Sequence, residues 1–134
     1  MSGERPATRI FIEKRRASPA HPYGIGGFMM LSKAGLRELD LRLADRTLGM
    51  QAIRVLIAMA QSIDYENRAH MGQKDLAAHL GMAQQHVSAS IRDLVACGFL
   101  ERPETSRGYY RISPRLLWQG SARTLRAALA REAA

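Results

Sequence analysis

The sequence predicts a mainly α-helical domain that carries one small β-hairpin near its C-terminal end. Hydrophobic residues make up 46% of the chain but aromatic residues only 6%, so the core has to be aliphatic, a composition that favours helices. Apolar residues recur three and four positions apart in successive stretches between residues 32 and 97. Two short β-prone runs follow directly, with a turn-rich stretch between them. At 134 residues the chain suits one domain with one core.

Three regions of the chain differ in composition. Residues 1–23 form a basic N-terminal arm, in which residues 9–13 are a candidate short strand. Residues 24–120 are expected to form the folded domain, and a joint rich in proline and glycine begins it. Residues 121–134 carry Leu125, Ala128 and Leu129 at helical spacing. We expect this last region to form a helix that is a candidate for dimerisation.

Two helices are expected in the first half of the domain. The first begins at Ser32, whose hydroxyl can accept a hydrogen bond from a free amide of the first turn. Leu36, Leu39 and Leu43 recur at helical spacing and predict one buried face. The second helix begins after Thr47, its expected cap. It carries a broad apolar stripe, which consists of Ile53, Leu56, Ile57, Ala60 and Ile63.

The next two helices, residues 73–80 and 83–97, are separated by a short turn that contains Gly81. Glycine can take the positive φ that a tight turn between steeply crossing helices requires. Ala77 is small enough for close approach of the two helices, and Val87 seals the inner face. This spacing is what a helix-turn-helix demands mechanically. An ordinary αα-hairpin in a helical bundle is the alternative interpretation.

The two β-prone runs are residues 99–102 and 109–112, and Gly98 is placed to end the helix before them. Arg107 lies in the turn-rich stretch that would form the tip of the hairpin. A hairpin directly after the second helix of a helix-turn-helix lies beside the same face of bound DNA. The sequence therefore predicts a winged helix-turn-helix.

The formal net charge of +8 favours a polyanionic partner. Double-stranded DNA is the first candidate and an anionic membrane surface the second, while the composition of the source genome is the plain alternative explanation of the charge. No stretch approaches the roughly 20 apolar residues of a membrane span, so we expect no membrane partner.

We expect a soluble, cytoplasmic protein, because a single cysteine, Cys97, rules out an intrachain disulfide and suits a reducing compartment.

Helix 83–97 is expected to lie in the major groove, where glutamine amides pair with adenine edges and arginine reaches guanine or phosphate. A residue at the hairpin tip would contact phosphate or the minor groove. For each side chain taken alone, a solvated helix face is the alternative interpretation. The predicted DNA-binding residues are Gln73, Lys74, Ala83, Gln84, Gln85, His86, Ser88, Ala89, Arg92 and Arg107.

The sequence predicts no catalytic, metal or cofactor site. It contains no Ser-His-Asp order, no glycine-rich phosphate loop and no paired carboxylates beside a histidine in a recognisable motif. Its four histidines are scattered and lack cysteines at ligand spacing, so a structural zinc site is not expected. The alternative to DNA binding is a winged-helix adaptor that binds other proteins without reading DNA.

The run from Met71 to Arg102 resembles the winged helix-turn-helix of many bacterial regulators. Residues 108–120 are similar to the wing and following element of the RepL-type plasmid replication proteins. In that segment, Ser113-Pro114 stands where the family has Asn-Pro, and Gly120 matches its terminal glycine. The resemblance covers about residues 24–120. It implies sequence-specific binding of double-stranded DNA, in transcriptional regulation or in plasmid replication and maintenance.

A single winged helix reads only a few base pairs, too few to find one site in a genome. We therefore expect a homodimer that binds an inverted repeat, with half-sites about 10 base pairs apart.

Overall fold

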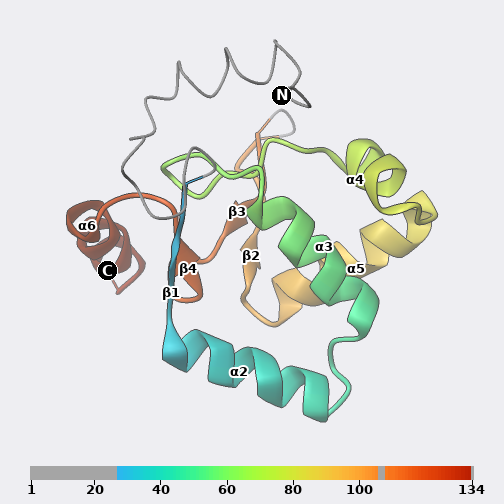
Figure 1. Cartoon of the computed structure of the whole chain (residues 1–134), viewed down its shortest axis with the longest axis horizontal. Coiled ribbons are helices and arrows are strands. Elements are labelled where there is room, and N and C mark those ends of the chain that lie inside the picture. The colour runs from blue at the N-terminus through green and yellow to red at the C-terminus, as the bar shows by residue number, and fades with distance from the viewer. Residues whose placement is uncertain (1–26, 106–107, 134) are drawn as a thin grey trace, which may run out of the picture.

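The computed structural model describes residues 27–105 and 108–133, and this part of the chain is mainly helical (Figure 1). Its helices are α2 (Lys33–Ala44), α3 (Met50–Ala60), α4 (Gln73–Leu80), α5 (Gln84–Ala96) and α6 (Ala122–Ala133). Its strands are β1 (Met30–Leu31), β2 (Leu100–Glu101), β3 (Arg111–Ile112) and β4 (Leu117–Trp118). The prediction of a mainly helical domain with a small hairpin is confirmed. The predicted N-terminal arm, residues 1–23, lies outside the described residues.

Helices α3, α4 and α5 pack most closely together and form the centre of the domain (Figure 1). Each supplies side chains that are completely buried: Val55 and Met59 from α3, Leu76 from α4, and Val87 and Leu94 from α5. Each such side chain stabilises the fold by about 1.5–3 kcal/mol relative to an exposed position. The burial of Val87 agrees with its expected place on the inner face of α5, whereas Val55 and Met59 lie outside the stripe that the sequence predicted for α3.

The strands form two antiparallel pairs. In the first, β2 pairs with β3 and Leu100 lies opposite Ile112, so the predicted hairpin is present. In the second, β1 pairs with β4 and Met30 lies opposite Trp118. This second pair joins the start of α2 to the segment before α6, and the sequence analysis did not predict it.

A short extended segment runs along the other edge of β3. Arg68 forms an antiparallel bridge with Arg111. The amide of Ala69 donates to the carbonyl of Tyr110 at 2.8 Å. The amide of Ile112 donates to the carbonyl of Asn67 at 2.9 Å. The chain between α3 and α4 is thereby fastened to the hairpin, which fixes the hairpin relative to the helices.

Asn67 lies at the centre of this connection and is completely buried. Its Nδ2 donates to the carbonyl oxygens of Ile112 at 3.0 Å and Leu117 at 2.7 Å, and its Oδ1 accepts from the amide of Gln119 at 3.0 Å. Its φ is +65°, in the left-handed region that asparagine tolerates better than most residues. In the sequence, Asn67 belongs to a polar stretch after the second predicted helix, and no local pattern indicates its partners.

Ser32 caps α2 as predicted, because its Oγ accepts a hydrogen bond from the amide of Gly35 at 3.0 Å. The expected buried face of α2 is wrong. Leu36 is exposed, and Leu39 and Leu43 are only half-buried. The buried residue of this helix is Gly35, where an added Cβ would lie 2.8 Å from the Cα of Leu116. Helix α2 thus contacts the domain through a close backbone approach at its first turn and through Leu39, which packs against the core, and not through a stripe of three buried leucines.

Helix α3 begins at Met50 with Gly49 as its N-cap, so the expected cap at Thr47 is also wrong. The amide of Thr47 instead donates to the carboxylate of Asp45, at 2.9 Å, in the turn after α2. Ile57, which was expected in the buried stripe of α3, is 55% exposed. Helices α4 and α5 pack against one face of α3 and cover only that face. Ile57 lies outside this face and is therefore exposed.

Helix α6 follows Ser121, whose Oγ accepts from the amide of Thr124 at 3.2 Å. Ala128 is buried against the rest of the domain, Leu125 is half-buried and Leu129 is exposed. The expected C-terminal helix is therefore present, and it packs partly on its own chain. None of the helices in residues 27–105 and 108–133 is long and apolar enough to cross a membrane.

Candidate nucleic-acid interface

The turn between α4 and α5 is built around Gly81, which has a φ of +66°. The amide of Met82 donates to the carbonyl of Ala77 at 3.1 Å and ends α4. A Cβ added at Gly81 would meet nothing within 4 Å, so the requirement for glycine comes from the backbone conformation and not from crowding. The predicted positive φ is confirmed, and α5 begins only three residues after the turn glycine, at Gln84.

A second left-handed glycine connects α5 to the hairpin. Gly98 has a φ of +84°. The amide of Phe99 donates to Leu94 and that of Gly98 to Val95, both at 3.0 Å, which is the hydrogen-bond pattern of a Schellman motif. The chain turns sharply here and enters β2 one residue after Phe99. The hairpin is thus attached to the end of α5 through a rigid turn.

Helix α5 has one face in the core and one face in solvent. On the inner face, Val87, Ser90, Ile91 and Leu94 are buried. Residues three and four positions apart lie on the same side of a helix. The row opposite the buried side therefore consists of Gln85, Ala89 and Arg92, of which the glutamine and the arginine are exposed.

The other predicted residues lie around this row. Gln84, which is exposed, and Ser88, which is half-buried, flank it on one side. His86 is exposed on the opposite flank, where Asp93 follows two turns later. Ala83 is the N-cap residue and is exposed. The helix thus brings most of the predicted residues onto one surface, and it places His86 on the same flank as Asp93, two turns away.

Both helices of this pair begin without a side-chain cap. Gly72 is the N-cap of α4 and Ala83 the N-cap of α5, and neither forms a cap hydrogen bond through a side chain. The first amides of each helix are therefore available to an external acceptor, for which phosphate is well suited. Lys74 lies in the first turn of α4 and Arg92 on α5, and within the described residues neither forms a salt bridge.

Gln73 is the predicted site residue with an intramolecular partner. It is half-buried, and its Nε2 lies 3.5 Å from the hydroxyl of Tyr110, the residue before β3. Beside this contact, the His70 ring lies against the Tyr109 ring with centroids 4.3 Å apart. These contacts hold the hairpin against the start of α4. No local sequence pattern predicts these contacts, because they join residues nearly forty positions apart.

Asp64 organises the segment that carries His70. Its carboxylate accepts from His70 Nε2 at 2.9 Å, Arg68 Nε at 3.0 Å and the amides of Glu66 at 2.8 Å and Arg68 at 2.9 Å. Partial burial opposes ionisation, but these hydrogen bonds outweigh it and lower the pKa of Asp64 to about 2. The carboxylate is therefore ionised throughout the neutral range and keeps the loop before α4 ordered.

The hairpin end of the candidate interface is defined only in part. Arg107, which was predicted to contact phosphate or the minor groove, lies outside the described residues. Of the neighbouring cations, Arg102 is exposed, whereas Arg111 is occupied by the backbone carbonyl of Glu66 at 3.0 Å and by the carboxylate of Glu101 at 3.7 Å. Arg102 is therefore the described hairpin cation that is free to contact an external anion.

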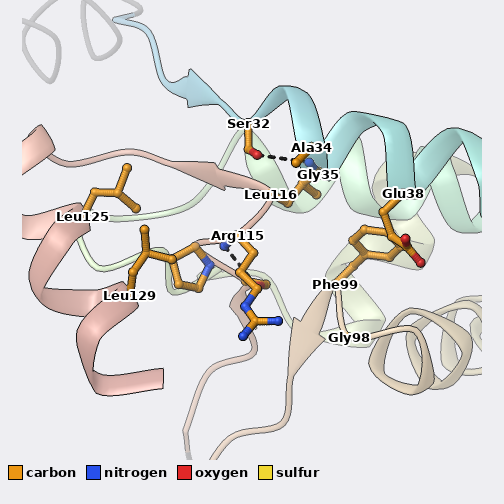
Figure 2. Close-up of a pocket in the computed structure, with 12 residues that line it drawn as sticks. Ser32, Ala34, Gly35, Glu38, Gly98, Phe99, Arg115, Leu116, Leu125 and Leu129 are labelled. Carbon is orange, nitrogen blue, oxygen red and sulfur yellow. Dashed lines mark hydrogen bonds between the residues drawn. The ribbon is translucent and has the colours of Figure 1, made fainter. Parts of the chain in front are cut away.

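An apolar hollow lies elsewhere on the described surface, between α2 and α6 (Figure 2). It has a volume of about 590 Å³, and apolar side chains such as Phe99, Leu116 and Leu129 line most of it. None of the predicted DNA-binding residues lines it. The exposed face of α5 is a convex surface, which suits a groove in its partner better than a small molecule.

In the part of the chain that the structure describes, no three histidine, cysteine, aspartate or glutamate side chains gather as a metal site would require. Partial burial raises the pKa of the Cys97 thiol, which disfavours its reactive thiolate form. Comparisons of the chain with protein-family models, with curated proteins and with solved structures find no match.

Proposed function

We propose that the protein binds double-stranded DNA as a winged helix-turn-helix, with α5 in the major groove and the β2–β3 hairpin as the wing. The strongest support for this proposal comes from helix α5 and its two connections. The exposed face of α5 presents Gln85, Ala89 and Arg92, and a left-handed glycine at each end of the helix connects it to α4 and to the hairpin. An α-helix fits the major groove, and such a face carries the side chains that read base edges there.

The charges around α5 support the same partner. The chain carries a net charge of +8, and Lys74 and Arg92 have no carboxylate partner among the described residues. Cations without an internal partner are free to replace the counterions of phosphate groups, which is the main source of affinity for DNA. The free amides at the starts of α4 and α5 provide further phosphate contacts. Phosphate contacts position the protein, and α5 supplies the sequence readout.

The side chains of α5 are proposed to differ in role. Gln85, at the centre of the exposed face, donates to and accepts from an adenine edge, and Ala89 is small enough to pack against a thymine methyl group. Arg92 reaches guanine or a phosphate. His86 contributes less, because Asp93 on the same flank repels phosphate.

We propose that the protein acts as a homodimer on an inverted repeat, as a transcriptional regulator or a plasmid replication or maintenance factor. A monomer reads too few base pairs for specificity, and two copies double the information. Exposed leucines on two helices, Leu41 of α2 and Leu129 of α6, support self-association of this kind.

Selection of bound sequences from a random duplex pool, followed by binding of α5 variants to the selected site, tests the proposal. Gln85→Ala is expected to weaken binding about tenfold and to relax the preference at one base position, which corresponds to about 1.4 kcal/mol. Arg123→Ala is the control for charge, because Arg123 is exposed on α6, away from α5. Arg92→Ala should weaken binding far more than Arg123→Ala does. Equal effects of the two arginine variants, or no enrichment of any sequence, would favour the protein–protein adaptor instead.

A further inference from the structure

The apolar hollow between α2 and α6 has the size of a small-molecule site. Figure 2 shows Leu125 and Leu129 of α6 on one side and the first turns of α2 on the other. Phe99 and Leu116 also line the hollow, and both are buried, so they form its base. The volume of about 590 Å³ lies within the range of roughly 300–1,000 Å³ that ligand pockets occupy.

The α2 side of the hollow is fixed by backbone contacts. The amide of Ser32 donates to the carbonyl of Leu116 at 2.8 Å. A Cβ added at Gly35 would lie 2.7 Å from the carbonyl oxygen of Arg115, so only glycine allows α2 to approach this segment so closely. The hollow is therefore formed before any ligand binds, as is usual for small-molecule sites.

Two neighbouring residues supply hydrogen-bond donors to the hollow. The Arg115 side chain is 74% exposed, and its Nε lies 3.4 Å from Glu132 Oε1, whereas its Nη atoms have no partner among the described residues. Ser113 is buried, and its Oγ accepts from the amide of Arg115 at 3.2 Å. Within the same part of the chain, the Ser113 hydroxyl has no acceptor for its own hydrogen. A ligand that satisfies both groups needs an acceptor, and the guanidinium favours an anionic one.

The other polar side chains that line the hollow do not oppose this choice. Glu38 Oε2 is paired with Arg42, whose Nε lies at 3.0 Å and Nη2 at 2.9 Å, so the charge of this carboxylate is balanced. Ser32 Oγ accepts from the amide of Gly35 at 3.0 Å, which leaves its hydroxyl hydrogen as a further donor. The hollow thus offers apolar walls, hydroxyl donors and one guanidinium whose Nη atoms are free.

We propose that this hollow binds an amphipathic monocarboxylate, a small molecule with one carboxylate and an apolar body. The carboxylate accepts from Arg115 and Ser113, because a planar guanidinium matches the two oxygens of a carboxylate. The apolar body lies between α2 and α6 and covers Phe99 and Leu116. A cationic ligand would meet no carboxylate without a partner, and a polyhydroxylated ligand would leave most of its polar groups against apolar walls.

The base of the hollow is also the connection between α5 and the hairpin. The amide of Phe99 donates to the carbonyl of Leu94 at the end of α5, and the amide of Ser113, just after β3, donates to the carbonyl of Phe99 at 2.9 Å. A ligand that contacts Phe99 and Ser113 therefore contacts the residues that set the hairpin relative to α5. We expect bound carboxylate to change the affinity for DNA. This consequence rests on the proposed function, whereas binding of the carboxylate does not.

The first test uses decanoate and the full-length protein at neutral pH without DNA, measured by isothermal titration calorimetry. Decanoate should bind at one saturable site per chain, and decylammonium, which has the same chain length and the opposite charge, should bind at least about tenfold more weakly. Arg115→Gln should weaken decanoate binding about tenfold. Arg123→Gln is the control, because Arg123 is exposed on α6 and does not line the hollow.

A second pair of variants tests the location of the site. Ala34 lines the hollow and is exposed on α2, so Ala34→Phe should fill the hollow and abolish decanoate binding. Ala44→Phe is the matched control, because Ala44 is exposed on the same helix and does not line the hollow. Far-UV circular dichroism verifies that each variant is folded. No binding of decanoate, equal binding of decylammonium, or unchanged binding in Ala34→Phe would overturn the proposal. Binding that appears only when the protein is diluted would assign the hollow to a second copy of the chain instead.

The regulatory consequence has a separate measurement. The affinity for a fluorescent duplex is compared in saturating decanoate and in acetate of the same ionic strength. We expect a severalfold change in the wild type and none in Ala34→Phe. If decanoate binds but leaves the affinity unchanged, the connection to α5 is wrong. If decanoate binds and the duplex does not bind in either salt, the proposed function fails and the carboxylate site stands.

Discussion

The side chain of Asn67 joins three backbone groups from two segments of the chain, and its three hydrogen bonds are made in a fully buried environment. Asn67→Ala leaves two carbonyls and one amide without their partner and places alanine at a positive φ. We expect the free energy of unfolding to fall by about 3 kcal/mol or more, measured by urea denaturation. Asn67→Gly removes the hydrogen bonds but accepts the φ of +65°. If the glycine variant were as stable as the wild type, the hydrogen bonds would not stabilise the fold.

Protonation of Asp64 is expected to destabilise the domain at low pH. Its pKa of about 2 lies below the ordinary value, so its hydrogen bonds stabilise the fold above about pH 4 and are lost as pH falls toward 2. We expect the melting temperature to drop over this range, and Asp64→Asn to reduce that drop. Asp40→Asn is the control, since Asp40 is exposed on α2 and has no ion pair in the described part of the chain. An unaltered acid profile in Asp64→Asn would contradict the assignment.

The roles of these two residues were not visible in the sequence. In the sequence, Asp64 and Asn67 stand in a polar stretch after the second predicted helix, which indicates a loop and nothing of its partners. The partners of Asn67 lie 45 to 52 residues further along the chain, and no local pattern predicts a bond of that range. By contrast, the roles of Ser32, Gly81 and Gly98 depend on neighbours within five residues, and the sequence predicted all three.

The turn between α4 and α5 requires a positive φ at one residue, Gly81. Gly81→Ala places a Cβ in the left-handed region and should destabilise the domain by about 1–2 kcal/mol, although the surrounding space is open. Gly81→Asn should cost less, because asparagine adopts this conformation more readily. Urea denaturation of the three proteins measures the order of stability. An alanine variant equal to the wild type would mean that the turn does not require a positive φ.

Helices and strands could be predicted where the pattern of neighbouring residues in the sequence indicates them. The spacing of apolar residues located α4 and α5 to within one residue at each end, and it placed the hairpin directly after them. It succeeded only in part for α2, because Leu39 packs against the core but the closest contact of that helix with the domain depends on the missing side chain of Gly35. It also missed the β1–β4 pair, since strands of two residues carry too short a pattern to recognise.

At the scale of the whole molecule, the proposed homodimer makes a prediction about α6. The full-length protein is expected to sediment as a dimer at micromolar concentration, and a variant that ends at Gly120 is expected to be a monomer. Far-UV circular dichroism is the control, because truncation removes the contact between Trp118 and Thr124. A full-length monomer, both free and on its selected DNA site, would contradict the homodimer. A truncated but folded dimer would move the interface to α2.

The candidate interface was predictable as a surface but not in every residue. The sequence placed Gln84, Gln85, Ser88, Ala89 and Arg92 together because helical periodicity alone brings them to one side of α5. The sequence does not show that the Gln73 side chain lies 3.5 Å from the hydroxyl of Tyr110. Side-chain partners across elements depend on the packing of the chain, and periodicity does not contain that information.

The most direct test of the central proposal is the affinity of the full-length protein for a fluorescent duplex at about 50 and about 200 mM salt, measured by anisotropy. Phosphate contacts from the surface around α5 predict that affinity falls steeply, with a log–log slope of several units. Lys74→Ala should reduce the slope by about one and weaken all duplex sequences alike. An affinity that does not change between the two salt concentrations, or no binding at the lower one, would contradict DNA binding by this surface.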